Sequence, residues 1–283
     1  MAINRKAYTM VQLRKAGQAL LVLALLIMIL FPIFWLGRIS LTAEKAILSE
    51  HVTLLPAKGD VSLEAYRIAF TEHDTLKYLF NSLFIVLCAT TVSLFFSISI
   101  AYVITKYEFK GRTAVMTGIL FSVTIPWIVY ILPLFTFAAQ VNWLDKHGFM
   151  IFLYGVSGIP LFTWFAMPYM QEFPTEMIEG AKIDGANDLV ILIRIIIPAV
   201  KNVLFALFLI RFIWAYNDLL FSLTFTFHKA KMIMPAILEF GGLYSVPFAR
   251  MAAGGVIAIT PIVLLVIVFQ KYIETGLTGR TFK

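Results

Sequence analysis

The chain has 283 residues, of which 60% are hydrophobic and only 14% are charged, and its formal net charge is +7. Soluble domains carry about 45–50% apolar and roughly 25% charged residues, and a water-exposed surface needs those charges. The composition therefore excludes an ordinary soluble enzyme and a disordered chain. A disulfide scaffold is excluded as well, because Cys88 is the only cysteine. We predict an all-α, polytopic membrane protein.

Six stretches are long and apolar enough to cross a membrane, since a spanning helix needs about 20 mostly apolar residues. In chain order they cover about residues 16–37, 78–102, 113–137, 149–170, 202–227 and 251–270. Helices are expected because hydrocarbon offers backbone polar groups no other partners. The first stretch follows Arg14 and Lys15 but exceeds the roughly 7–15-residue core of a signal peptide, so we expect it to be retained. The six helices would form a single membrane domain over residues 1–283.

The distribution of Lys and Arg predicts the orientation in the membrane. If the N-terminus lies inside, the inside loops hold more of these residues than the outside loops, and Arg5, Lys6, Arg14 and Lys15 form the clearest group. Cytoplasmic loops are enriched in Lys and Arg, which favours an N-in and C-in topology. The charges are scattered and form no basic stripe, so the positive balance does not indicate nucleic-acid binding.

The inside loop between the fourth and fifth predicted spans, about residues 171–201, carries the signals of two short helices. Pro174 suits a helix start, and Glu176 and Glu179 follow where carboxylates favour the positive end of the helix dipole. Gly185 stands where a left-handed residue ends a helix, and a second amphipathic stretch runs to Pro198. From these residues alone, the loop is either a solvated interfacial segment or a docking helix for a cytoplasmic partner.

The loop resembles the EAA loop of ABC importer permeases, whose pattern is Glu-Ala-Ala, three residues, Gly, nine residues and then Ile-x-Leu-Pro. The matching positions are Glu179, Gly180, Ala181, Gly185, Ile195, Ile197 and Pro198, of which Gly180 and Ile197 depart from the pattern. Shorter matches to the carbohydrate-importer permeases include Asn81-Ser82-Leu83 and Tyr216-Asn217-Asp218. Together the matches span about residues 80–283, and the chain is similar to the smaller, maltose-permease-type subunit of that family.

The resemblance implies a non-catalytic permease subunit in the cytoplasmic (inner) membrane of a bacterium or archaeon, which imports a sugar or oligosaccharide by alternating access. Its expected partners are a second homologous permease, an ABC ATPase dimer, an extracytoplasmic solute-binding protein and membrane lipid. ATP and Mg²⁺ would bind the ATPase, because this chain has no phosphate-binding loop of the Walker type. The residues expected to couple to the ATPase are Glu176, Glu179, Gly180, Ala181, Asp184, Gly185, Ile195 and Pro198.

Two charges, Arg211 and Asp218, fall inside the fifth predicted span, where each needs a partner or water. Seven residues apart, they would lie on nearly one helix face at about 10.5 Å by helical rise, a gap that their long side chains or Asn217 could bridge. They form either a structural polar cluster at the interface with the second permease or a wall of the translocation cavity. The residues expected along the substrate path are Trp127, Tyr130, Arg211, Trp214, Tyr216, Asn217 and Asp218. Pro126 and Pro133 are expected to bend the third span.

Other functions remain open at this stage. Arg211 departs from the residues expected in carbohydrate importers, so a sugar phosphate or another polar solute is an alternative substrate. A secondary transporter that couples ions through Arg211 and Asp218 is less favoured, because the sequence shows no internal repeat with broken helices in both halves. A channel would need rings of pore-lining charge. No catalytic or metal-binding residues are expected, because no motif of either kind is found.

Overall fold

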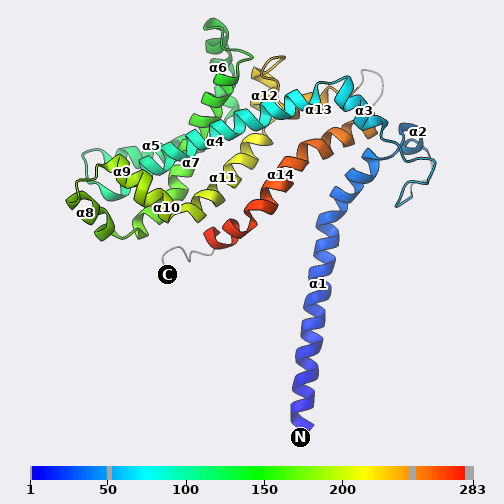
Figure 1. Ribbon diagram of the computed structural model, residues 1–283, viewed down its shortest axis with the longest axis horizontal. Coiled ribbons are helices and arrows are strands. Elements are labelled where there is room, and N and C mark those ends of the chain that lie inside the picture. The colour runs from blue at the N-terminus through cyan, green and yellow to red at the C-terminus, as the bar shows by residue number, and fades with distance from the viewer. Residues whose placement is uncertain (1, 50–52, 242–246, 278–283) are drawn as a thin grey trace. The chain divides into compact units, whose positions relative to one another are not determined.

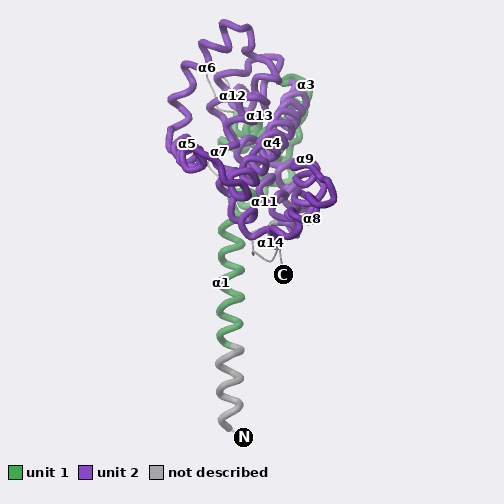
Figure 2. The backbone as a smooth tube through the Cα atoms, turned by 90° about the vertical axis from the view of Figure 1, so that its left-hand side faces the viewer, with its two compact units in different colours: residues 1–73, 240–257 green, residues 74–239, 258–283 purple. Residues whose placement is uncertain are grey.

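The computed structural model describes residues 2–49, 53–241 and 247–277, and within them every regular element is a helix. The one feature of β type in this described part is an isolated bridge between Thr42 and Val61. The chain divides into two compact units, coloured separately in Figure 2: Met1–His73 with Phe240–Ile257, and Asp74–Glu239 with Ala258–Lys283. The all-helical architecture agrees with the fold class predicted from composition.

The first unit contains α1 (Ala2–Ser40), α2 (Glu44–Ile47), α3 (Glu64–Thr71) and the first part of α14 (Phe248–Leu277). Its small core is formed by Ala65, Ala249 and Ala253. The Glu44 carboxylate accepts hydrogen bonds from the backbone N–H groups of Phe248 and Ala249, at 2.8 and 3.0 Å, which satisfies donors that a helix start leaves free. None of the most apolar stretch of α1 is buried, as expected of a helix whose surroundings are lipid or another protein.

The second unit is built around α4 (Thr75–Lys106), α7 (His147–Glu172) and α11 (Lys201–Tyr216), with α4 and α7 in the most extensive helix contact (Figure 1). Small residues permit this close approach. A Cβ atom added at Gly158 of α7 would overlap Ser93 Oγ of α4, whereas one at Gly155 would be in ordinary contact with Val92, 3.5 Å from its Cγ1. Ser97 of α4 donates a hydrogen bond to the Ile159 carbonyl of α7 at 3.2 Å. These contacts fix the two helices along their length.

Four helices are long and apolar enough to cross a membrane alone, and the number of candidate spans in the described chain rises to at most six if each of two bent helix pairs counts as one span. The single helices are Leu13–Ser40, Thr75–Lys106, His147–Glu172 and Phe248–Tyr272. They overlap the predicted spans at about 16–37, 78–102, 149–170 and 251–270. The third and fifth predicted spans differ from expectation, because neither is one continuous helix.

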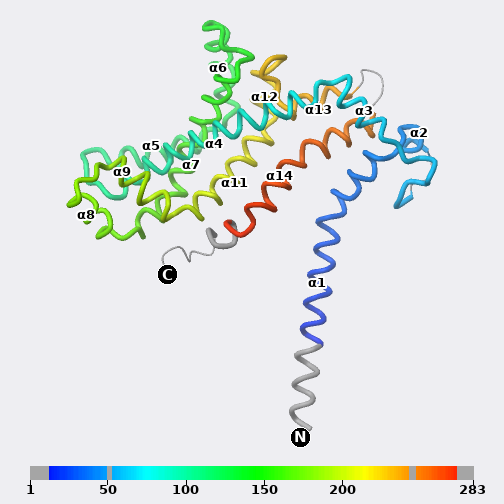
Figure 3. The backbone as a smooth tube through the Cα atoms, viewed as in Figure 1, coloured from blue at the N-terminus to red at the C-terminus, as the bar shows by residue number. Residues whose placement is uncertain are grey.

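The third predicted span is broken at Pro126 into α5 (Arg112–Thr124) and α6 (Ile128–Gln140), which meet at 95° (Figure 3). Proline has no backbone N–H and disfavours helical backbone in the residue before it. Ile125 is accordingly extended, with φ −77° and ψ 121°. Pro133, by contrast, lies inside α6. The predicted bend therefore occurs at the first of the two prolines.

The fifth predicted span, about 202–227, also ends early. Helix α11 stops at Tyr216, and the short helix α12 (Leu220–Phe225) follows after a break of three residues. Upstream, α9 (Asp188–Ile191), the π-helix η1 (Leu192–Ile196) and α10 (Ile197–Ala199) meet α11 at 85°. The π-helix lies next to Pro198, whose missing N–H prevents the ordinary bond to Arg194. The second amphipathic stretch is thus helical but irregular.

Polar contacts join loops at one end of the second unit. Asp145 accepts hydrogen bonds from the backbone N–H groups of residues 227–230, at 2.8–3.1 Å. The amide of Asn81 donates to the carbonyls of Lys229 and Lys231, both at 3.0 Å, and its oxygen lies 2.8 Å from His147 Nε2. Helix α13 (Ile233–Leu238) follows, with the Ile233 N–H bonded to Ser82 Oγ at 2.7 Å. All of these residues belong to the end predicted to lie outside.

Candidate functional site

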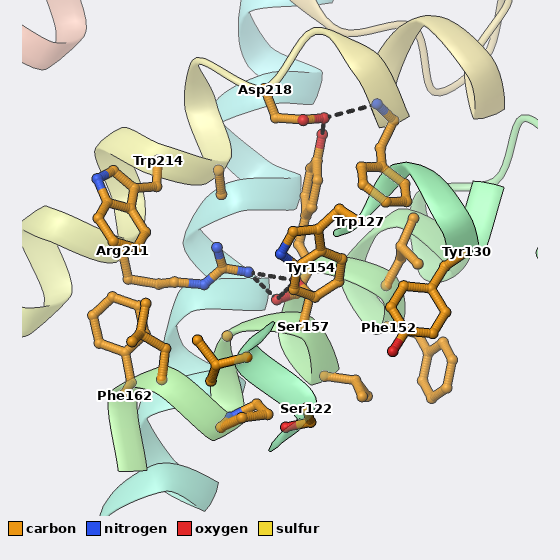
Figure 4. Close-up of a pocket in the computed structure, with 18 of the residues that line it drawn as sticks. Ser122, Trp127, Tyr130, Phe152, Tyr154, Ser157, Phe162, Arg211, Trp214 and Asp218 are labelled. Carbon is orange, nitrogen blue, oxygen red and sulfur yellow. Dashed lines mark hydrogen bonds between the residues drawn. The ribbon is translucent and has the colours of Figure 1, made fainter. Parts of the chain in front are cut away.

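A cavity of about 580 Å³ lies in the second unit, between α5, α6, α7, α11 and α12 (Figure 4). Its walls are mainly apolar and rich in aromatic side chains, with few polar groups, as is usual for a small-molecule site. The aromatic lining residues are Trp127, Tyr130, Phe152, Tyr154, Phe162, Trp214 and Phe221. Ring contacts hold several of them: Trp127 meets Phe221 edge-on at 5.8 Å and Phe162 meets Trp214 at 6.1 Å.

Two of the helix breaks in the second unit border this cavity. Trp127 follows the Pro126 break between α5 and α6, and Asp218 lies in the break between α11 and α12. Irregular backbone at membrane depth is tolerated where it lines a cavity or is enclosed by protein, and broken helices mark the substrate sites of many transporters. The breaks therefore place polar groups beside the aromatic walls.

Arg211 reaches the cavity from α11 and is held by α7. Its Nη2 donates to the Tyr154 carbonyl and to Ser157 Oγ, the latter at 2.9 Å. The side chain is only 7% exposed. Gly158 makes room for it, since a Cβ atom there would overlap Arg211 Nε and Ser93 Oγ. Within the described residues, Nε is buried without a hydrogen-bond partner.

Asp218 is fixed by three donors on one oxygen. Its Oδ2 accepts from the Tyr154 hydroxyl at 2.8 Å and from the backbone N–H groups of Phe221 and Ser222 at 3.0 and 3.3 Å. The last two are donors at the start of α12, so Asp218 acts as a helix cap there. This capping explains why the chain leaves the helical path after Tyr216.

The predicted relation between Arg211 and Asp218 is wrong in two respects. They do not share a helix face, because Asp218 lies beyond the end of α11. Asn217 does not bridge them, because its side chain donates to the Ile213 carbonyl at 2.9 Å. Tyr154 connects them instead, with its hydroxyl on Asp218 and its carbonyl on Arg211.

The structure brings together five of the seven residues predicted along the substrate path. Trp127, Tyr130, Arg211, Trp214 and Asp218 all line the cavity. Tyr216 does not line it; this residue is 1% exposed and donates its hydroxyl to the Ala258 carbonyl at 3.0 Å. Asn217 is exposed outside the cavity lining.

Sequence reasoning missed Tyr154, Ser157 and Ser122, which supply polar atoms to the cavity wall. A signal existed for Tyr154, because a tyrosine hydroxyl inside an apolar helix needs a hydrogen-bond partner. Its partner, Asp218, is 64 residues away in the sequence, and the local pattern says nothing about that pairing.

The 171–201 loop forms the predicted pair of helices. Helix α8 (Thr175–Ile183) ends at Asp184, and Gly185 follows with φ +84°, the left-handed conformation that glycine adopts at a helix end. Asn187 then caps α9 by accepting the Val190 N–H at 2.9 Å. Pro174 precedes α8 at its cap position.

The predicted coupling residues lie mostly on the surface of this turn. Those that are exposed are Glu176, Glu179, Gly180, Asp184, Gly185 and Pro198, while Ala181 and Ile195 are half-buried. Apolar side chains stand among them: Ile183 is 87% exposed and Met177 is 50% exposed. Ile178 anchors the helix from its other side, at 5% exposure. An exposed apolar and acidic surface on a short helix is suited to contact with another protein.

A polar cluster, formed by Tyr102, Tyr107, Lys182 and Asp188, fastens this loop to the end of α4. Both tyrosine hydroxyls donate to Asp188 Oδ1, the Tyr102 bond at 3.1 Å. Lys182 donates to the Tyr107 hydroxyl at 2.6 Å and lies 3.5 Å from Asp188. Hydrogen bonding by Tyr107, with smaller contributions from Tyr102 and Lys182, lowers the pKa of Asp188 against the opposing effect of desolvation. Lys106 adds a 2.6 Å bond to the Phe173 carbonyl.

The comparison with known families agrees with these features. The family described as "Binding-protein-dependent transport system inner membrane component" matches residues 93–279. The match covers well over half of the chain, so the chain belongs to this family. It is a permease component of a transport system and not an enzyme, as the sequence predicts.

Individual relatives are found over nearly the whole length. The trehalose/maltose transport system permease protein MalG of Thermococcus litoralis is 32% identical over 91% of this chain and 92% of its own. A bacterial ABC transporter involved in the import of the acidic polysaccharide alginate has a similar fold, with a TM-score of 0.77 at 22% identity over 92% of this chain and 96% of that one. A second structure is the bacterial alginate ABC transporter in complex with an alginate pentasaccharide-bound periplasmic protein. Its TM-score is 0.65, at 15% identity over 95% of both chains.

Proposed function

We propose that this chain is the transmembrane permease subunit of an ATP-driven importer that moves a saccharide into the cytoplasm by alternating access. Membership of the binding-protein-dependent family supports import, and the similar proteins described above transport trehalose, maltose or alginate. The observation that carries the proposal is the exposed helix–glycine–helix turn of residues 171–201. A transport subunit without a nucleotide site needs such a surface to receive work from an ATPase.

The proposed topology has six spans in a single membrane domain, with both termini inside. Helices α1, α4, α7 and α14 supply four spans, and the α5–α6 pair supplies the third in chain order. The fifth is α11 with α12, because the 16 residues of α11 reach only about 24 Å at 1.5 Å per residue, short of about 30 Å of hydrocarbon.

Contacts within the second unit support the proposed pairing of loops on each side of the membrane. Tyr107, Lys182 and Asp188, which come from two loops predicted inside, meet in one cluster. Asn81, Asp145 and Lys229, which are predicted outside, meet in another. A topology with these loops on opposite faces would separate residues that are bonded, so the pairing of loops agrees with the proposed order of spans, while the assignment of one face to the cytoplasm rests on the distribution of Lys and Arg.

Coupling to the ATPase is proposed to occur through α8. Its exposed residues Glu176 and Glu179 are suited to basic or N–H donor groups on a partner, and Met177 and Ile183 to an apolar cleft. Movement of α8 would be transmitted to α4 by the Tyr107–Lys182–Asp188 contacts and by Lys106. ATP and Mg²⁺ would be held by the ATPase dimer.

The other proposed partners follow from the same family membership. A second homologous permease and lipid would surround the unburied apolar stretch of α1. An extracytoplasmic solute-binding protein would deliver the substrate; the similar alginate transporter was solved in complex with a periplasmic protein. The proposed location is the cytoplasmic (inner) membrane of a bacterium or archaeon.

Within the chain, the proposed substrate path is the aromatic cavity. The flat faces of Trp127, Tyr130 and Trp214 suit the apolar faces of sugar rings. Asp218 and Arg211 provide an acceptor and a donor for polar substituents. A sugar phosphate or another polar solute is the alternative cargo at the same site.

Charge reversal at Glu179 tests the coupling proposal. We expect Glu179→Lys to leave the assembled transporter in the membrane and to reduce substrate uptake per ATP hydrolysed by at least about tenfold, the effect of a lost or repelled charge-assisted contact of about 1.4 kcal/mol or more. The measurement is ATPase activity and uptake side by side in proteoliposomes that contain the whole transporter and its binding protein.

The matched control for this experiment is Glu108→Lys. Glu108 is an exposed carboxylate in the loop that follows α4, also predicted inside but outside residues 171–201. The control should retain normal coupling. Normal coupling in Glu179→Lys itself would contradict docking through this residue.

A further inference from the structure

We propose that the saccharide carried by this permease bears an anionic group, such as a carboxylate, sulfonate or phosphate, which binds Arg211 in the aromatic cavity. The inference rests on the proposed function and narrows its substrate class. Three observations carry it: the partners of the Arg211 guanidinium, the nitrogen of that group that forms no hydrogen bond, and the hydrogen bonds already made by the Asp218 carboxylate.

The guanidinium of Arg211 has no anionic partner among the described residues. The ion pairs formed there join Arg67 to Glu64, Lys182 to Asp188 and Lys231 to Glu239. Arg211 instead bonds two neutral oxygens, the Tyr154 carbonyl and Ser157 Oγ. A buried cation in a membrane-spanning helix normally requires a counter-charge or water. The cavity side of Arg211 is therefore a place where an incoming anion gains a strong interaction.

The three nitrogens of the guanidinium have different roles. Nη2 is committed to Tyr154 and Ser157, and Nε is enclosed beside Gly158 and unpartnered. Nη1 donates to no residue in the described part of the chain and, unlike Nε, is not enclosed. Figure 4 shows the guanidinium between Trp214 and Tyr154, with bonds drawn from a single nitrogen. Nη1 is thus the group available to a ligand.

Asp218 forms no ion pair with Arg211, although its negative charge acts on the guanidinium from a distance. Its Oδ2 is saturated by the Tyr154 hydroxyl and by two N–H groups of α12, and no cation lies within ion-pair distance of it in the described chain. Its other oxygen forms no hydrogen bond there and is suited to sugar hydroxyls, which donate. The two charges therefore offer complementary contacts: an acceptor for hydroxyls at Asp218 and a cationic donor for an anion at Arg211.

A purely structural role for Arg211 would predict a different outcome. Fastening α11 to α7 needs only two neutral hydrogen bonds from Nη2, which a glutamine amide can also donate. A structural arginine would give no preference between neutral and acidic saccharides. A higher affinity for acidic than for neutral saccharides therefore distinguishes a ligand-binding Arg211 from a structural one.

The test compares two trisaccharides with the same α-1,4 linkage, neutral maltotriose and acidic trigalacturonate, at pH 7. Binding is measured by tryptophan fluorescence of the whole transporter in nanodiscs without the binding protein, because Trp127 and Trp214 line the cavity. We expect trigalacturonate to bind about tenfold or more tightly than maltotriose, the effect of one charge-assisted hydrogen bond. Arg211→Gln should abolish the preference, Arg211→Lys should retain part of it, and Ser157→Ala, which keeps the charge, should retain most of it.

Each result has a distinct meaning. Equal affinity for both trisaccharides in the wild-type transporter overturns the inference while leaving saccharide import intact. A preference that survives in Arg211→Gln overturns the assignment to Arg211. Binding of neither trisaccharide contradicts the proposed cavity and its substrate class together. If Arg211→Gln does not assemble, the wild-type comparison and the Arg211→Lys variant still decide the matter.

Discussion

Gly158 on α7 leaves the space that the Arg211 side chain fills at the cavity wall. A side chain there would overlap Ser93 Oγ of α4 and Arg211 Nε of α11, and would lie 2.9 Å from Arg211 Cζ. The absence of a Cβ atom thus allows three helices to meet around a charged side chain. Small residues serve the same purpose in membrane helix packing generally.

We expect Gly158→Ala to destabilise the assembled transporter, because overpacking costs about 1–3 kcal/mol. Gly148→Ala is the matched control: it lies in the same helix, and a Cβ atom there would meet nothing within 4 Å. Thermal unfolding in detergent, followed by size-exclusion chromatography, measures both. If both variants unfold at the wild-type temperature, the close approach at Gly158 is not needed for stability.

Asp145 provides a prediction of pH dependence. Its carboxylate is partly desolvated, which raises its pKa, but hydrogen bonds from the N–H groups of Lys229, Phe227, Ala230 and His228 outweigh this and lower the pKa below its ordinary value. A depressed pKa in the folded state stabilises the protein above the unfolded value, about 3.9 for Asp. This stabilisation is lost as pH falls through the lower folded value.

The Asp145→Asn variant measures how much the ionised Asp145 carboxylate contributes to the stability of the folded protein. Wild type should be more stable than Asp145→Asn at pH 7, and the difference should shrink as the pH is lowered below about 4. Thermal unfolding at pH 7, 5 and 3.5 gives the comparison. A difference that grows on acidification would have the wrong sign for a carboxylate that accepts four N–H bonds.

At the level of elements, the sequence predicts a turn or break when the residues that cause it are neighbours in the chain, and misses it when they lie on different helices. The turn from α8 to α9 was predicted from local signals, since Pro174, Gly185 and the following polar residues act within a few positions. The break after Tyr216 was not predicted, because it depends on Asp218 capping α12 while bonded to Tyr154 of another helix. The break at Pro126 was predicted as a bend in one helix, but not as a 95° turn between two.

The contacts between α8, α9 and α4 give a prediction of their own. Asp188→Asn should weaken the bonds from Tyr107, Tyr102 and Lys182 that tie the loop to α4. We expect a severalfold lower uptake per ATP hydrolysed, with ATPase activity itself retained. Glu108→Gln, which removes an exposed carboxylate at the same end, is the control. Unchanged coupling in Asp188→Asn would show that α8 transmits its movement by another route.

At the level of the whole molecule, two features agree with the proposal that this chain works together with other subunits. Its sequence contains no phosphate-binding loop, and the most apolar stretch of α1 has none of its residues buried in the structure. Its family is defined by transport with a separate binding protein. In the proposed assembly, the other subunits would supply the energy, the substrate and part of the hydrophobic cover, while the composition of this chain predicts only its membrane setting.

The most direct test of this account is purification of the chain from its native cells in a gentle detergent, followed by identification of every stoichiometric partner. We predict one unlike permease and an ABC ATPase present as a dimer, with residues 171–201 protected from proteolysis in the complex. Recovery of the chain alone or as a homo-oligomer, with no ATPase in any detergent, would contradict coupling through this loop. Ion-coupled transport involving Arg211 and Asp218 would then be the reading to test.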